Sequence, residues 1–228
     1  MVPPHNDPMI DLWLVRHGET DWNRELRFQG HLDAPLNALG LRQAQRLGEY
    51  LATLPPRPVL ASDLLRTRQT AQPLSQQWQT QAETDSLWRE QAFGVIEGLT
   101  LEEIRERHPE VVHQWRRHDP DYAPEGGESR RQFHARVMQA VQALVQRCAQ
   151  EGWRSPLVVS HGGVLDMVYR SATGQLLGGP RECTIPNAGL NRVRTDGERF
   201  EIVQWAQTEH LQGLPPSAVY PVATPSRV

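Results

Sequence analysis

An apolar run over residues 9–15, interrupted by Asp11, stops abruptly at Arg16, His17 and Gly18. This pattern predicts a buried strand that leads into a polar loop. In open α/β sheets, ligands usually bind in the loops at the carboxyl ends of the strands. A histidine can attack phosphorus while a neighbouring guanidinium holds the phosphate oxygens. We therefore expect a functional site at the end of this first strand, although an isolated Arg-His pair is more often a histidine with its hydrogen bonds satisfied beside a surface arginine.

Strand-like and helix-like segments alternate along the rest of the chain. A long loop is expected over residues 20–36, followed by a helix that Asn37 caps. The expected strands cover residues 58–61, 83–88, 157–160, 190–194 and 200–205, and the expected helices cover residues 39–54, 63–78, 101–107, 110–118 and 128–151, with a last one from Val164. Ser62 should cap the helix at 63–78, and Pro73 should kink or divide it. The alternation predicts an α/β fold, a three-layer α/β/α sandwich with a mostly parallel central sheet.

The length of 228 residues suits one domain over residues 1–228. Residues 1–8 and about 214–228 contain several prolines and no periodic pattern, so we expect flexible tails there. Cys148 and Cys183 have no metal-binding spacing and are expected to be two buried thiols rather than a disulfide.

Charge and hydropathy limit the kinds of partner. A net charge of −3 argues against a nucleic-acid partner, and no apolar stretch is long enough for a membrane span or a signal peptide. We expect a cytoplasmic protein with a small phosphorylated substrate and no membrane partner. The oligomeric state stays open.

Two histidines and two arginines follow the ends of expected strands: Arg16, His17, Arg66 and His161. Because a parallel sheet places such ends side by side, these groups can converge on one pocket. Arginine suits a tetrahedral dianion because its planar fork makes two parallel bonds to phosphate. The backbone N–H of Gly162 can add a further donor. The pattern predicts a phosphate-binding pocket.

The chain resembles the histidine phosphatase superfamily, the phosphoglycerate mutase-like proteins, whose signature matches residues 14–20. Further pieces match in family order: Trp22-Asn23, Phe28-Gln29-Gly30, Asp33, Pro35-Leu36, Gly40, residues 62–67, Thr70-Ala71, Glu90, Phe93-Gly94, Glu97-Gly98-Leu99 and residues 160–163. The resemblance implies that His17 is the nucleophile and becomes phosphorylated. It also implies that Arg16, Arg66 and His161 hold the transferring phosphoryl group, with Asn23 as an amide donor.

The resemblance further implies that Glu90 protonates the leaving oxygen and then activates water, so that His17, Glu90 and His161 form the catalytic set. Glu97 and Glu102 lie on a nearby segment and are rivals for the acid role. The commonest mutase form has an arginine after this glutamate, where this chain has Gln91. Trp115, Arg116, Arg117 and Tyr122 are candidates for the wall that selects the substrate, although a surface position is the commoner one for such residues.

Three reactions compete. The first is a phosphoric monoester hydrolase of the histidine acid phosphatase type, which works without a metal or cofactor. The second is a cofactor-dependent phosphoglycerate mutase. The third is a binding protein or a zinc site made of His17, His161 and Glu90, which the flanking arginines disfavour because they repel a cation.

The segment between Glu90 and Glu128 favours the hydrolase. Cofactor-dependent mutases of this superfamily carry a longer insertion there, which helps to close the site against water. The pieces at residues 93–100 and 186–189 also look like the phosphatase branch, whose members act on ribazole phosphate, phosphoserine and sugar phosphates. The sequence leaves the choice among these substrates open.

Overall fold

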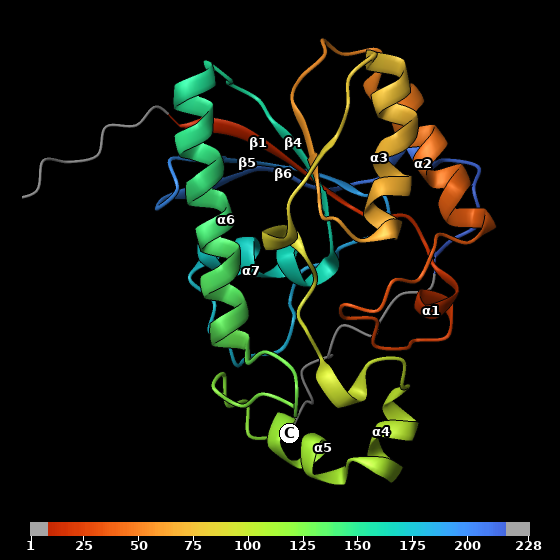
Figure 1. The fold of residues 1–228 in the computed structure, drawn as a ribbon, viewed down its shortest axis with the longest axis vertical. Coiled ribbons are helices and arrows are strands. Elements are labelled where there is room, and N and C mark those ends of the chain that lie inside the picture. Colours follow the sequence, from red (N-terminus) through yellow and green to blue (C-terminus); the bar gives the residue numbers. More distant parts are fainter. Residues whose placement is uncertain (1–8, 218–228) are drawn as a thin grey trace, which may run out of the picture.

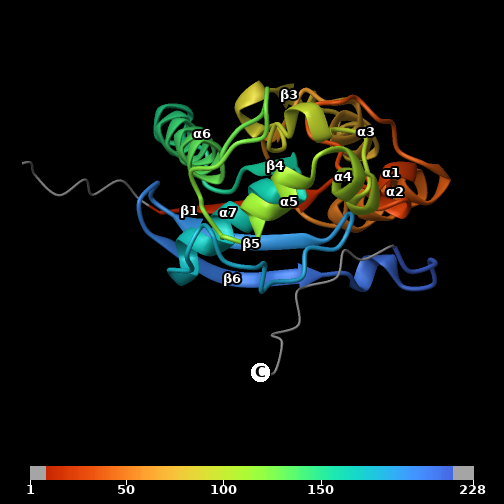
Figure 2. The same ribbon diagram turned by 90° about the horizontal axis from the view of Figure 1, so that it is seen from below.

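The central sheet of the computed structural model, which describes residues 9–217, has six strands in the order β3-β2-β4-β1-β5-β6 (Figures 1 and 2). The strands are β1 (Ile10–Arg16), β2 (Val59–Ala61), β3 (Glu83–Thr84), β4 (Leu157–Ser160), β5 (Leu190–Thr195) and β6 (Phe200–Gln207). The first four strands in this order are parallel, whereas β5 runs antiparallel to both of its neighbours, β1 and β6. The prediction of a mostly parallel sheet is therefore confirmed. The flexible tail expected at residues 1–8 lies outside the described residues. Residues 218–228 of the tail expected at about 214–228 also lie outside them.

Helices cover both faces of the sheet, which confirms the three-layer architecture. Alternate residues of β1 point to opposite faces, as the pleat of a strand requires. Leu12 and Leu14 pack in the core beneath α6 (Arg130–Glu151) and α7 (Gly162–Thr173). Trp13 and Val15 pack beneath α2 (Ala38–Leu51) and α3 (Leu65–Trp78). Cys148 and Cys183 are buried free thiols of the first core, as expected.

Local capping signals explain where α2 and α6 begin. The Asn37 side chain accepts a hydrogen bond of 2.9 Å from the backbone N–H of Gly40 at the start of α2. Ser129 and Gln132 form a capping box at the start of α6, which ends at Gly152 with φ of 70°. These contacts satisfy backbone groups that a helix end leaves without partners. The predicted cap at Asn37 is confirmed, whereas α6 begins at Arg130 rather than at Glu128.

Several predicted boundaries were wrong. The third strand covers only Glu83–Thr84, because Asp85 caps a short 3-10 helix over Ser86–Trp88. Ser62 does not cap α3, which starts at Leu65 without a side-chain cap and runs through Pro73 as one undivided helix. The expected loop at 20–36 contains a one-turn helix, α1 (Asp21–Arg24). Helix α2 ends at Leu51 rather than Leu54, α5 ends at Trp115 rather than His118, and α7 begins at Gly162 rather than Val164.

A small helical unit lies beyond the end of the sheet (Figure 1). It contains α4 (Leu101–Arg107) and α5 (Pro109–Trp115), which pack on an apolar cluster of their own around Ile96, Ile104 and Val111. The ring of Phe28 stacks on that of Trp115 with 5.3 Å between centroids and joins the unit to the 20–36 segment. Within the described part of the chain, no helix combines the length and apolar character needed to cross a membrane.

Candidate active site

The ends of two adjacent parallel strands bring His17 and His161 together. In the register of β1 and β4, Arg16 is the partner of Ser160, so each histidine follows directly on paired residues. The backbone N–H of His17 donates to the carbonyl of Ser160 over 2.9 Å. The two rings pack edge to face with 5.3 Å between centroids, and both side chains are buried. The convergence predicted from the strand ends is therefore present.

The His17 imidazole has the protonation state that a nucleophile needs. Its Nδ1 lies 2.7 Å from the carbonyl oxygen of Gly18. A carbonyl can only accept, so Nδ1 carries the proton and Nε2 keeps its lone pair. Burial, together with the charges of Arg66 and Arg16, holds the pKa of His17 well below its ordinary value and outweighs the bond to Gly18. The ring is therefore neutral and able to attack an electrophile.

His161 is fully buried, and neither of its ring nitrogens has a hydrogen-bond partner among residues 9–217. Buried polar atoms without partners are rare in proteins, and a role in catalysis is one of the explanations for them. Burial and the nearby charge of Arg66 also hold the pKa of His161 well below its ordinary value. The residue stands at the N-cap of α7, so the partial positive charge of that helix end lies beside it.

Backbone carbonyls hold the two arginines in place. Arg16 donates from Nη1 to the carbonyl of Ile185 over 2.6 Å. Arg66, at the second position of α3, donates to the carbonyls of Leu32 and Gly30 over 2.9 and 2.8 Å. These bonds orient both guanidinium groups before a ligand arrives, which reduces the entropy cost of binding an anion.

Asn23 and Gly162 add donors of a different kind. The Oδ1 atom of Asn23 accepts from the backbone N–H of Thr20 over 3.1 Å and from Nδ2 of Asn187 over 3.2 Å. This orientation leaves the amide NH2 of Asn23 for a ligand. Gly162 is the first residue of α7, where backbone N–H groups and the helix dipole favour an anion.

A cavity of about 230 Å³ joins these groups. Six of the seven predicted site residues line it: Arg16, His17, Asn23, Arg66, Glu90 and Gly162. The seventh, His161, is absent from the cavity wall and lies buried against the ring of His17. Phe28, Gln29, Phe93, Arg130 and Arg181 also line it and were not predicted.

Glu90 stands out among the three candidate acids. Its carboxylate accepts from the backbone N–H of Gly163 over 3.0 Å and from that of Gln91 over 2.9 Å. Glu97 instead accepts from backbone N–H groups of the surrounding loops and, like the exposed Glu102, is absent from the cavity wall. The geometry favours Glu90.

A steric constraint explains why the second residue of the Gly162-Gly163 pair is a glycine. A Cβ atom on Gly163 would lie 2.0 Å from Oε1 of Glu90, far inside van der Waals contact. Only glycine lets the carboxylate approach the start of α7 this closely.

A second cavity of about 410 Å³ shares five lining residues with the first: Phe28, Glu90, Phe93, Arg130 and Arg181. Aromatic side chains supply much of its wall: Phe28, Phe93, Trp115, Tyr122 and Phe133. Of the four candidate wall residues, Trp115 and Tyr122 therefore line it, whereas Arg116 and Arg117 do not.

The contacts that hold the backbone around His17 were not predicted from the sequence. Asn187 donates from Nδ2 to the carbonyl of His17 over 3.0 Å, and Ala188 donates its N–H to the carbonyl of Arg16 over 3.0 Å. Thr70 accepts from the N–H of Gly18 over 2.9 Å. The matching pieces at 186–189 and Thr70 were the available signals, but no pattern in the sequence indicates which atoms they contact.

The alternative zinc site of His17, His161 and Glu90 is not formed as a set of metal ligands in the described part of the chain. Across residues 9–217, no group of three or more His, Cys, Asp or Glu side chains is arranged to hold a metal ion.

Comparisons with known proteins agree on one family. The model of the histidine phosphatase superfamily (branch 1) matches residues 12–208. A probable phosphoglycerate mutase GpmB of Klebsiella pneumoniae subsp. pneumoniae is 35% identical over 81% of this chain and 85% of its own length.

Two similar solved structures come from other bacteria. Bacillus stearothermophilus YhfR has a TM-score of 0.79 at 30% identity, covering 89% of this chain and 99% of its own. A mycobacterial glucosyl-3-phosphoglycerate phosphatase, solved with VO3, has a TM-score of 0.76 at 30% identity, covering 87% and 100%.

Proposed function

Since this chain belongs to the histidine phosphatase superfamily, branch 1, we propose that it is a phosphomonoesterase that hydrolyses a small phosphorylated metabolite through a phosphohistidine on His17. The neutral His17 ring and the donors around the small cavity support this reaction. Vanadate is a phosphate mimic, and the similar mycobacterial phosphatase carries it in one of its structures. The aromatic cavity is the proposed site for the leaving group.

In the first step, Nε2 of His17 attacks phosphorus, and the bond from phosphorus to the ester oxygen breaks. Arg16 and Arg66 balance the charge on the three equatorial oxygens, and His161 is proposed to add a neutral N–H donor. Glu90 gives its proton to the leaving oxygen, so the product departs as a neutral alcohol.

In the second step, a water molecule attacks the phosphohistidine from the side that the alcohol has left. Glu90 takes a proton from this water, and the bond from phosphorus to Nε2 of His17 breaks. Inorganic phosphate then departs, which returns His17 to its neutral form and Glu90 to its protonated form. Both steps balance without a cofactor.

The position of Glu90 is the observation that carries this proposal. It is on the wall of the small cavity that contains His17 and also on the wall of the larger aromatic cavity. The ester oxygen of a bound phosphomonoester has to lie where these two cavities meet. A proton donor is needed at that junction.

A cofactor-dependent phosphoglycerate mutase is the second candidate. The name of the Klebsiella relative favours it, and a mutase would use the same phosphohistidine. The short segment between Glu90 and Glu128 favours hydrolysis instead, because transfer back to the substrate requires the intermediate to be held away from water.

One experiment separates the two reactions. The purified protein is given 3-phosphoglycerate with a trace of 2,3-bisphosphoglycerate and, in parallel, a set of phosphomonoesters. We expect little 2-phosphoglycerate and clear release of inorganic phosphate from several of the esters. Isomerisation at roughly 10 per second or faster, with negligible phosphate release, would assign the protein as a mutase.

Removal of metal ions should leave the activity unchanged. Arg16, Arg66 and the start of α7 supply the positive charge that a metal would otherwise bring to the phosphoryl group. Hydrolysis of p-nitrophenyl phosphate is measured before and after exhaustive chelation. Activity that disappears and returns only with zinc or magnesium would contradict this prediction.

A further inference from the structure

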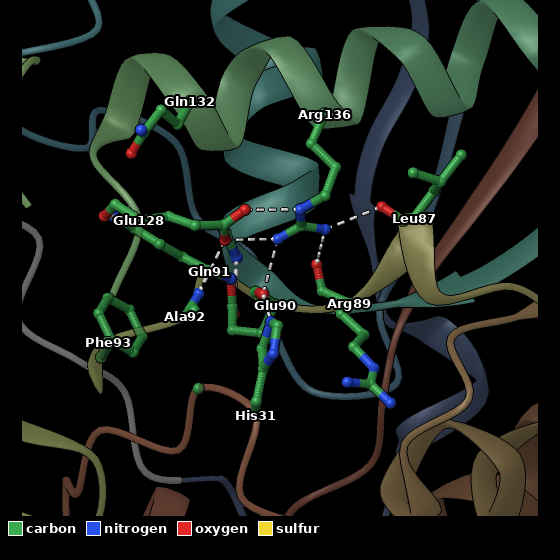
Figure 3. Close-up of polar contacts among 12 residues, drawn as sticks. His31, Leu87, Arg89, Glu90, Gln91, Ala92, Phe93, Glu128, Gln132 and Arg136 are labelled. Carbon is green, nitrogen blue, oxygen red and sulfur yellow. Dashed lines mark hydrogen bonds and ion pairs between the residues drawn. The ribbon is translucent and has the colours of Figure 1, made fainter. Parts of the chain in front are cut away.

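The guanidinium of Arg136 on α6 uses all five of its N–H groups around the segment that carries Glu90 (Figure 3). Nη1 donates to the carbonyls of Leu87 and Arg89, both over 2.9 Å, and Nη2 donates to the carbonyl of Glu90 over 2.9 Å. The remaining two N–H groups bind the two carboxylate oxygens of Glu128, each over 2.7 Å.

Glu128 completes this arrangement from the loop before α6. One of its carboxylate oxygens accepts from the N–H of Ala92 over 2.9 Å, and its backbone carbonyl accepts from Nε2 of Gln91 over 2.8 Å. The bonds from Arg136 and Ala92 outweigh the effect of burial and lower the pKa of Glu128. The pair therefore stays charged and holds the chain on both sides of Glu90.

The segment needs such support because the sheet does not provide it. Strand β3 ends at Thr84, so the backbone of residues 87–90 makes no backbone–backbone hydrogen bonds with a neighbouring strand of the described chain. Their four consecutive carbonyls instead accept from side chains: Arg136 for residues 87, 89 and 90, and Ser160 for Trp88 over 2.7 Å. His31 adds a second bond to the carbonyl of Glu90 over 2.9 Å.

We propose that Arg136, oriented by Glu128, is the positioning residue that holds Glu90 at the junction of the two cavities. This inference rests on the proposed role of Glu90 as the proton donor. Arg136 touches the backbone of the donor residue and is absent from the wall of either cavity. It acts through the place of the Glu90 carboxylate, not through contact with the substrate.

The test uses the dependence of the rate on the leaving group. An alkoxide such as that of glycerol 3-phosphate must be protonated as it leaves, whereas the weakly basic p-nitrophenolate leaves without a proton. The double variant Arg136→Met/Glu128→Leu removes both charges, so neither is left buried alone. We expect kcat/KM to fall about a hundredfold for glycerol 3-phosphate and only about a few-fold for p-nitrophenyl phosphate.

Arg147→Met is the matched control. Arg147 also lies on α6 and makes a bidentate pair with Glu83 over 2.6 and 2.8 Å, but on an exposed surface. This control should keep the rates with both substrates. Arg136→Lys, which keeps the charge but has fewer donors, should lose less on glycerol 3-phosphate than the double variant.

The outcomes separate this inference from the proposed function. Glu90→Gln is measured with the same two substrates. If it shows the selective loss and the double variant does not, the positioning role is wrong while the role of Glu90 stands. If Glu90→Gln shows no selective loss, the proton donor lies elsewhere. A folded double variant that loses both activities equally would mean that Arg136 does not act selectively through the proton donor, and would overturn the proposal.

Discussion

The variant His17→Ala is expected to lose turnover by a factor on the order of 10⁴ or more, the scale of loss seen when a catalytic nucleophile is removed. The Nε2 atom of His17 is the only proposed acceptor of the phosphoryl group, and alanine offers no nucleophile in its place. The pocket itself should survive. Arg16 and Arg66 keep their bonds to the loop carbonyls, which do not involve the imidazole of His17.

The measurement is covalent labelling together with steady-state kinetics. A substrate labelled in its phosphate is mixed with the enzyme and quenched in base, which preserves phosphohistidine. The wild type should carry the label and His17→Ala should not. His113→Ala is the control, because His113 is exposed on α5 outside both cavities, and it should label like the wild type. Equal labelling of wild type and His17→Ala would show that another residue is the nucleophile.

The variant Glu90→Gln has the next largest expected effect, a fall of about 10²- to 10⁴-fold in kcat/KM for alkyl phosphates. Glutamine has nearly the shape of the acid but cannot give a proton to the leaving oxygen. The same variant should also hydrolyse phosphohistidine slowly, because it has no base for the attacking water. The labelled intermediate should therefore accumulate when p-nitrophenyl phosphate is the substrate.

The control for this variant is Glu102→Gln. Glu102 is the exposed rival acid on α4 and lies outside both cavities, so this change should leave the kinetics with alkyl phosphates unaltered. Rapid quenching after mixing measures how much labelled enzyme is present at each time. A Glu90→Gln variant with wild-type rates would remove Glu90 from the mechanism, and a large loss in Glu102→Gln would transfer the acid role.

The amino-acid sequence by itself was enough to predict the groups that follow β1 and β4. An apolar strand that ends in Arg16-His17-Gly18, and another that ends in His161-Gly162, are local patterns, each contained within a few residues. The alternation of strands and helices then predicts a parallel sheet, which brings such strand ends together. Capping by Asn37 was predicted for the same reason, since the side chain and its backbone partner are neighbours in the chain.

Tertiary structure alone decided what surrounds those groups. The bonds from Arg136 to the carbonyl of Glu90 and from Asn187 to the carbonyl of His17 join residues far apart in the chain. The early end of β3 removes the expected sheet support at Glu90, and a side chain from α6 supplies the missing donors. The periodic pattern of the sequence does not indicate such a contact. The chemistry of a guanidinium determines only that it binds carbonyl and carboxylate oxygens. Which carbonyls it meets depends on how α6 packs across the sheet.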